Sequence, residues 1–352
     1  MVTLVSQMAA AVVTAQTPPQ LSGRDRELAQ QMLSQVHQTL KQNYYDPSFH
    51  GLDVVKRFEK YSSEIKAANT FQTAYRAIEA FLMGLNDSHT IFLPPPNSKR
   101  ITYGFRVKMI GDQCFVTALR PGSDAAQKIH IGDQVLALNG YAVSREDLWQ
   151  LEYYLNFLPP RSATDFTLHD ASGNTRRESV NADLEPLPAR RPSSPSLNRM
   201  HLENWQHNIR SRSAEQADVF FWKFASFNED EVAIGHMLSE ARKHRALVLD
   251  LRENGGGSQN NLSFVLGSLF DHDITIAKEV TRKEAKPLTA KSRGSSVFSG
   301  QLVALVDSRS ASASELLARV LQIEHRGAVI GDRSAGSVMA AKFFPLSPGV
   351  GM

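Results

Sequence analysis

The chain has 352 residues, a formal net charge of +3 and 42% hydrophobic residues. This is the composition of a globular protein of two or three domains. The near balance of charge, without a basic run that carries interleaved aromatics, does not indicate a nucleic-acid partner. The single cysteine, Cys114, excludes an intrachain disulfide and a zinc site built from several cysteines.

Residues 1–20 are apolar and small before they turn polar at Gln16, and 13–15 read Val-Thr-Ala, as in a small-residue cleavage site. The apolar part is too short to span a bilayer. We interpret it as the end of a secretory signal, which predicts an exported protein, periplasmic or extracellular. The alternative is a disordered N-terminus.

Residues 21–96 predict a helical subdomain. Apolar side chains recur every four residues on the first stretch, and a second stretch covers 62–83. The recurring side chains are Leu28, Met32, Val36 and Leu40. A polar, proline-containing break at 43–47 separates the two stretches.

Residues 97–185 predict a β-rich domain, because short β-type runs alternate with Gly-, Pro- and Asn-containing turns. One helix fits 145–157. Residues 186–352 then predict an α/β core, since apolar strand-like runs alternate with amphipathic helices. The run at 246–251 is almost continuously apolar, which is typical of a strand buried on both faces.

Three separated segments are candidates for one site. Residues 250–257 read DLRENGGG, a buried strand that enters three glycines, whose N–H groups could form an oxyanion hole. Residues 310–315 read SASASE, which places a serine at the start of a helix after a strand. Residues 86–90 read NDSHT and offer a histidine as a base.

Each segment also has an ordinary structural explanation. The glycines could form a flexible loop, and Ser312 with Glu315 matches a helix capping box. The histidine could simply pack beneath a polar turn. The three segments taken singly therefore do not establish a catalytic site.

Taken together and in this order, the segments resemble the C-terminal-processing, or tail-specific, peptidases and their tricorn-core relatives. The resemblance implies an α/β (α+β) multidomain fold with a helical N-terminal subdomain, a PDZ-like domain and a layered core of the crotonase/ClpP type. It also implies that Ser312 is the nucleophile. Gly256 or Gly257, together with Ala313, would supply the oxyanion N–H groups.

The residue available as the base decides which of the two groups, the processing peptidases or the tricorn relatives, the chain resembles more. Ser337 stands where the processing branch has its lysine, which excludes a Ser–Lys dyad at this position. The tricorn-like branch uses a Ser-His pair ahead of the PDZ-like domain, and Ser88-His89 matches it. We therefore expect His89 to be the general base and Ser88 to support it. No residue up to Met352 matches the late glutamate of that branch, so a truncated or degenerate member is expected.

Residues 103–107 resemble the carboxylate-binding loop of PDZ domains, where a peptide C-terminus adds as a strand. These are Tyr103, Gly104, Phe105, Arg106 and Val107. The alternative is a small β-domain that only shapes the entrance to the active site.

The sequence therefore predicts a serine-type peptidase that acts on polypeptides and needs no metal or organic cofactor. A non-catalytic peptide-binding relative is the main alternative, and a carrier of apolar ligands on the same fold is a third. Since tricorn relatives assemble, the resemblance leaves homo-oligomerisation open.

Overall fold

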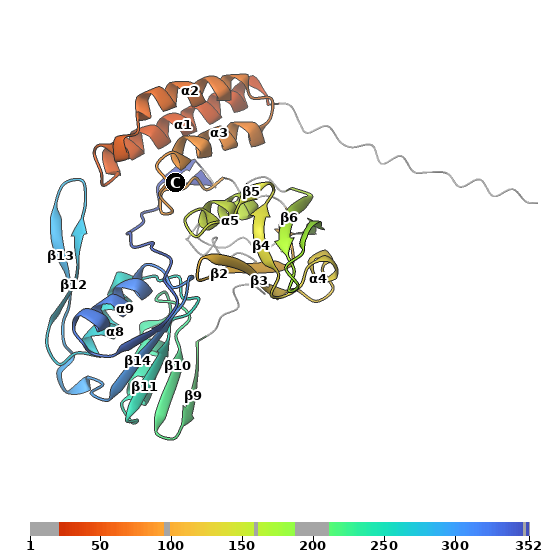
Figure 1. Ribbon diagram of the computed structural model, residues 1–352. Helices are drawn as coiled ribbons and strands as arrows, with labels where there is room; N and C mark the ends of the chain where they lie inside the picture. Colours follow the sequence, from red (N-terminus) through yellow and green to blue (C-terminus); the bar gives the residue numbers. More distant parts are fainter. Residues whose placement is uncertain (1–20, 95–98, 158–160, 187–210, 348–349, 352) are drawn as a thin grey trace, which may run out of the picture.

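The computed structural model describes residues 21–94, 99–157, 161–186, 211–347 and 350–351. A helical bundle, a β-rich part and an α/β core follow one another along the chain (Figure 1). Within these described ranges, no helix is both long and apolar enough to cross a membrane. The expected secretory signal lies at residues 1–20, outside the described residues.

The N-terminal bundle consists of α1 (Gly23–Asn43), α2 (Val54–Ala67) and α3 (Phe71–Met83). Each helix begins at a polar N-cap whose side chain accepts a backbone N–H, namely Ser22, Asp53 and Thr70. The predicted spacing on α1 buries Met32, Val36 and Leu40, whereas Leu28 is 37% exposed. Burial of one such side chain stabilises the fold by about 1.5–3 kcal/mol, so these apolar faces hold the bundle together.

The β-rich part contains a sheet in the order β2-β3-β4-β6-β7, with β5 beside β4. Its strands are β2 (Phe105–Ile110), β3 (Gln113–Leu119), β4 (Gln134–Leu138), β5 (Tyr141–Ala142), β6 (Ala163–His169) and β7 (Thr175–Asn181). Two helices, α4 (Asp124–Lys128) and α5 (Leu148–Phe157), accompany it. A separate pair joins β1 (Lys99–Thr102) to β8 (Asp183–Pro186). In this arrangement β2 is an edge strand.

The core contains a five-stranded sheet in the order β15-β14-β11-β10-β9, parallel except for β9. Its strands are β9 (Arg212–Gln216), β10 (Val219–Lys223), β11 (Ala246–Asp250), β14 (Gln301–Val306) and β15 (Ala328–Gly331). Its helices are α7 (Glu231–Ala241), α8 (Gln259–Gly267) and α9 (Ala313–Ile323). A 3-10 turn, η3 (Gly294–Ser296), precedes β14.

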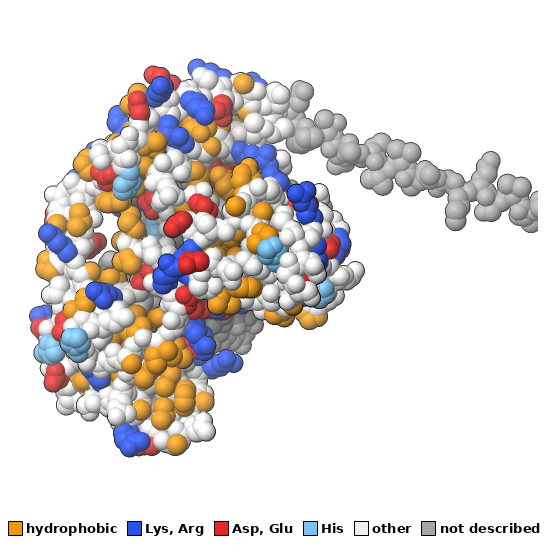
Figure 2. All heavy atoms as spheres, viewed as in Figure 1, with side chains coloured by type: hydrophobic (Ala, Val, Ile, Leu, Met, Phe, Trp, Pro, Cys, Tyr) orange, Lys and Arg blue, Asp and Glu red, His pale blue; other side chains and the backbone are white. Residues whose placement is uncertain are grey.

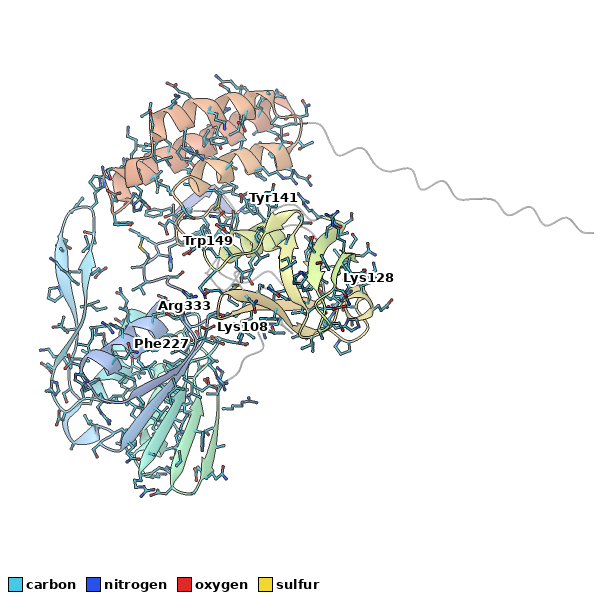
Figure 3. The ribbon with its side chains drawn as sticks, in the orientation of Figure 1. Lys108, Lys128, Tyr141, Trp149, Phe227 and Arg333 are labelled. Atoms are coloured by element: carbon cyan, nitrogen blue, oxygen red, sulfur yellow. The ribbon has the colours of Figure 1, made fainter. Side chains whose placement is uncertain are left out.

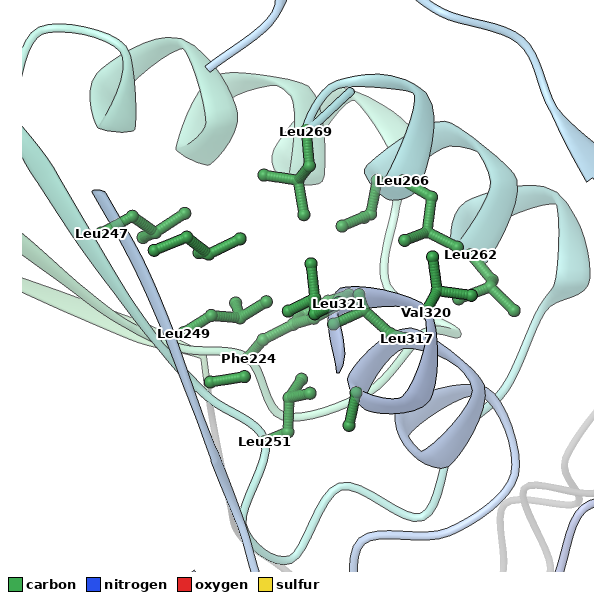
Figure 4. Packing of buried hydrophobic residues seen from close by; sticks show 14 of the residues in the cluster. Phe224, Leu247, Leu249, Leu251, Leu262, Leu266, Leu269, Leu317, Val320 and Leu321 are labelled. Atoms are coloured by element: carbon green, nitrogen blue, oxygen red, sulfur yellow. The ribbon is translucent and has the colours of Figure 1, made fainter. Parts of the chain in front are cut away.

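One face of this sheet forms the core. Leu247 and Leu249 of β11 pack with Leu262 of α8 and Leu317 of α9 (Figure 4). The expectation that β11 is buried on both faces was wrong, because Val248 between the two buried leucines stays partly exposed. The apolar run predicted the strand but not its environment, because valine fits a half-buried pleated surface equally well.

Two segments of the core reach back to the helical bundle. The hairpin of β12 (Ile274–Val280) and β13 (Ala285–Ala290) extends from the core towards the end of α1 (Figure 1). At its tip, Arg282 donates to the carbonyl of Tyr44 at 3.3 Å. Past the core, β16 (Pro345–Ser347) lies against α1 and pairs with β17 (Val350–Gly351). Leu346 of β16 joins the apolar cluster of the bundle, so the bundle is held close to the core.

Candidate active site

Ser312 lies on a strained turn between β14 and α9. Its φ of 55° and ψ of −116° place a non-glycine residue in the left-handed region, which costs on the order of 1–3 kcal/mol. Ala313 is the first residue of α9, and the N–H groups of a first helical turn have no partner within the helix. A strained strand-to-helix turn that presents a serine beside such N–H groups is typical of a nucleophile site.

The Glu315 carboxylate fixes this turn to a second loop. One oxygen accepts the backbone N–H groups of Ser312 at 2.8 Å and Ser337 at 2.9 Å. The other accepts the Gly336 N–H at 2.8 Å and the Ser334 hydroxyl at 2.7 Å. Glu315 is only 8% exposed, so these charge-assisted bonds are shielded from water. The capping-box interpretation was therefore correct for Glu315, but the same carboxylate also orders residues 334–337.

The glycine loop packs directly on the serine turn. Gly256 has a φ of +92°, and a Cβ built on it would lie 2.7 Å from the Ser312 Cβ and 2.9 Å from the Ala313 nitrogen. Only glycine fits a position with this backbone conformation and this close approach. Two segments that are far apart in the sequence thus meet at backbone contact distance.

Asn254 holds that loop in place from inside the core. It is fully buried, its side-chain N–H donates to the carbonyl of Phe224 at 2.9 Å, and its side-chain oxygen accepts the Gly256 N–H at 2.9 Å. Its carbonyl accepts the Ala311 N–H at 3.0 Å and the Ser314 hydroxyl at 2.9 Å. The Gly256 N–H is therefore engaged within the loop, a role for Asn254 that the sequence analysis did not identify.

The NDSHT turn follows α3 and reaches the same place. Asp87 accepts the His89 N–H at 2.9 Å and the Thr90 hydroxyl at 2.7 Å, which orders the turn. The Ser88 hydroxyl lies 3.2 Å from Nδ1 of His89 and 3.3 Å from the hydroxyl of Ser337. The contact with Ser337 joins the helical bundle to the loop that Glu315 orders.

The surroundings of His89 keep it neutral near pH 7. Burial lowers the pKa of His89, while the negative charges of Asp87 and Glu315 oppose that change without outweighing it. The influence of Glu315 on the histidine also shows that the NDSHT turn and the start of α9 are electrostatic neighbours. A neutral imidazole is the form that can accept a proton.

Segment 103–107 has the geometry of a tight loop that enters β2. Gly104 has a φ of +72°, and a Cβ there would lie 2.4 Å from the Ser123 Cβ. The side chains of Tyr103 and Phe105 are buried in the apolar cluster of the β-rich part. A glycine is required at this turn because the chain passes directly over the start of α4.

The outer edge of β2 is in contact with the core. The Val107 carbonyl accepts from Arg309 at 2.5 Å, and the Met109 carbonyl accepts from Ser308 at 2.6 Å. These carbonyls are groups that an added peptide strand would use. Strand addition along β2 and this contact with the core therefore compete for the same atoms.

Charged side chains join β2 to the two loops of the core. Lys108 lies 3.1 Å from Glu253 and 2.7 Å from Asp307, and Arg106 lies 2.9 Å from Glu253. Burial would raise the pKa of Glu253, but the positive charges and hydrogen bonds of Arg106 and Lys108 outweigh it and hold the pKa at about 2. Figure 2 shows basic and acidic side chains close together where the β-rich part meets the core, and Figure 3 labels Lys108 and Arg333 in this region.

Within the part of the chain that the structure describes, no cluster of His, Cys, Asp and Glu side chains could hold a metal ion. Cys114 is free and buried in β3.

Comparisons with known proteins match this arrangement. Residues 221–352 match peptidase family S41, and residues 91–150 match the PDZ domain family. The chain is 24% identical over 269 residues to the tail-specific protease of Haemophilus influenzae, covering 71% of this chain and 36% of that protein. It is 26% identical over 337 residues to a chloroplastic C-terminal processing peptidase of Tetradesmus obliquus, covering 88% of this chain and 68% of that protein.

Solved structures share the fold. A photosystem II D1 C-terminal processing protease matches with a TM-score of 0.56 at 23% identity, covering 92% of this chain and 86% of that chain. Mature CPAF complexed with lactacystin matches with a TM-score of 0.66 at 14% identity, covering 92% and 88%. The predicted α/β multidomain fold is confirmed. Along the chain, the match to the PDZ domain family precedes the match to peptidase family S41, in the order that the sequence motifs indicated.

Proposed function

We propose that the chain is a serine-type peptidase that cleaves polypeptides through an acyl-enzyme on Ser312. The observation that carries the proposal is the meeting of three distant segments: the Ser312 turn, the Gly256 loop packed on it, and the Ser88-His89 turn. His89 takes the proton of the Ser312 hydroxyl as Oγ attacks the scissile carbonyl, and then gives it to the leaving amine. Water afterwards hydrolyses the acyl ester by the same route.

The oxyanion would be held by the N–H groups of Gly257 and Ala313. The Gly256 N–H already donates to Asn254, so the exposed neighbour Gly257 is the better donor of the two glycines. Its φ of +140°, and a clash of any Cβ there with Asn228 at 2.7 Å, support a requirement for glycine. Removing one such donor typically costs about 10²–10³ in rate.

The test is the rate of reaction with a fluorophosphonate and the hydrolysis of a fluorescent casein. The native chain should react and hydrolyse, Ser312→Ala should do neither, and His89→Gln should lose about 10²–10⁴ in rate. Ser63→Ala, on the exposed surface of α2, is the matched control and should behave as the native chain. An unreactive native chain, or one that reacts equally without His89, would refute the proposal.

The non-catalytic peptide-binding alternative is not favoured, because the matched relatives are named as proteases. Recognition of a substrate C-terminus along β2 also has to displace Ser308 and Arg309 from the strand's outer carbonyls. We therefore propose polypeptide substrates without assigning the 103–107 segment as their required binding site.

We also propose that the protein acts outside the cytoplasm, in the periplasm or the extracellular space. The apolar start of the chain with its small residues at 13–15 supports this. Fractionation of cells that express the chain, with N-terminal sequencing of the product, tests it. An uncleaved product in the cytoplasmic fraction would contradict it.

A further inference from the structure

Ser337 contacts three parts of the site through three different groups. Its carbonyl accepts the Ser312 N–H at 3.1 Å, its N–H donates to Glu315 at 2.9 Å, and its hydroxyl lies 3.3 Å from that of Ser88. Ser88 in turn contacts Nδ1 of His89 at 3.2 Å. Residue 337 is therefore bonded to both the nucleophile turn and the base-bearing turn.

We propose that Ser337 is a positioning residue that completes a hydroxyl relay, Ser337–Ser88–His89, and thereby presents Nε2 of His89 to Ser312. The inference rests on the proposed function and adds a residue to it. Nothing in the ordinary triad scheme requires a serine at this place, because an acidic side chain usually orients the imidazole.

The direction of the hydrogen bonds follows from the chemistry. A base that accepts a proton at Nε2 must carry its own proton on Nδ1. Nδ1–H then donates to the Ser88 oxygen, and the Ser88 hydroxyl donates to the Ser337 oxygen. Since a hydroxyl both accepts and donates, two in series can keep this polarity. Without an acceptor at residue 337, the Ser88 hydroxyl is free to turn and donate to Nδ1, which places the proton on Nε2.

A neutral relay orients the imidazole but does not stabilise its positive charge. That stabilisation comes instead from Asp87 and Glu315, whose charges act to raise the pKa of His89 against the effect of burial. In the familiar triad, one carboxylate both orients the imidazole and stabilises its positive charge. Here the two hydroxyls orient the imidazole, and Asp87 and Glu315 stabilise its charge.

Side-chain and backbone roles of Ser337 are separable. Ser337→Ala removes only Oγ and keeps the backbone bonds to Ser312 and Glu315. Ser337→Thr keeps the hydroxyl. The nucleophile turn should stay intact in both variants, so a difference between them reports on the relay and not on folding.

The first measurement is the rate of fluorophosphonate labelling against pH for the native chain, both variants and Ser63→Ala. Ser337→Ala should label about 10-fold more slowly, a fraction of a full general-base effect, with an altered pH profile. Ser337→Thr should stay within about 2-fold of the native rate. Equal rates and profiles for the native chain and Ser337→Ala would overturn the inference.

The second measurement does not depend on activity. Imidazole nitrogen chemical shifts of His89 give the tautomer in the native chain and in Ser337→Ala. The relay predicts a proton on Nδ1 in the native chain and a shift towards Nε2 in the variant. An unchanged tautomer would overturn it. A native chain that shows the predicted tautomers but never labels would refute the peptidase proposal and leave the relay supported.

Discussion

Gly256→Ala tests the contact between the glycine loop and the Ser312 turn. The new Cβ would lie 2.7 Å from the Cβ of Ser312, 2.8 Å from the Ala311 carbonyl and 2.9 Å from the Ala313 nitrogen. Ordinary contacts of a Cβ begin at roughly 3.5 Å between carbon atoms. The serine turn or the glycine loop must therefore move by several tenths of an ångström to about 1 Å.

The expected cost has two parts. Overpacking costs about 1–3 kcal/mol, and a side chain at a φ of +92° adds roughly 1 kcal/mol of backbone strain. The free energy of unfolding should fall by about 2–4 kcal/mol, measured by urea denaturation. Because a displacement of about 1 Å at a reacting centre can cost 10²-fold, fluorophosphonate labelling should slow by about that factor.

Gly255→Ala is the control, since a Cβ at Gly255 meets nothing within 4 Å. It lies next to Gly256 in the same loop and should change stability by no more than about 0.5 kcal/mol. If Gly256→Ala matches Gly255→Ala in both stability and labelling rate, the loop does not pack on the Ser312 turn.

Three further predictions concern titratable groups. Glu315→Gln replaces a carboxylate oxygen that accepts hydrogen bonds with an amide NH₂ group, which faces donors and cannot accept from them. Labelling should therefore slow at least about 10-fold, and the free energy of unfolding should fall by about 2 kcal/mol. Native values in both assays would contradict this prediction. Glu79 is 1% exposed, and burial raises the pKa of its carboxyl to about 8, partly offset by the positive charge of Arg76. The folded protein therefore keeps the proton on Glu79 at pH values above 4.5, where the unfolded chain loses it. Stability should therefore fall by on the order of 4 kcal/mol between pH 4.5 and 8, and Glu79→Gln should remove most of that slope in denaturation curves. The labelling rate should rise with pH through an apparent pKa below 6.5, because burial lowers the pKa of His89; a midpoint above 7 would show that another group is the base.

The fold was largely predictable because its signals are local. The four-residue spacing of α1 and the apolar run of β11 each lie within one element, and the turns between the PDZ strands carry their own glycines. The one-sided burial of β11 was not predictable, because it depends on which elements cover the sheet. The exposure of Leu28 escaped prediction for a similar reason, since the angle at which helices meet decides how wide the buried stripe is.

The candidate site was predictable only in its residue types. The three motifs supplied Ser312, His89 and the glycines, but the sequence could not show that the Gly256 N–H is engaged by Asn254. It also could not show the three bonds from Glu315 to Ser334, Gly336 and Ser337, because no local pattern connects those residues to a helix N-terminus. Long-range hydrogen bonds of this kind depend on tertiary structure and leave no periodic signal in the sequence.

The most direct test of the account is to identify the residue that a fluorophosphonate modifies, by mass spectrometry of peptides from the labelled chain. We expect an adduct on Ser312 alone within the SASASE segment, because Ser310 and Ser314 are fully buried. On the same timescale, His89→Gln should form no adduct. An adduct on another serine, or one on Ser312 that forms equally fast without His89, would contradict the pairing of these two residues.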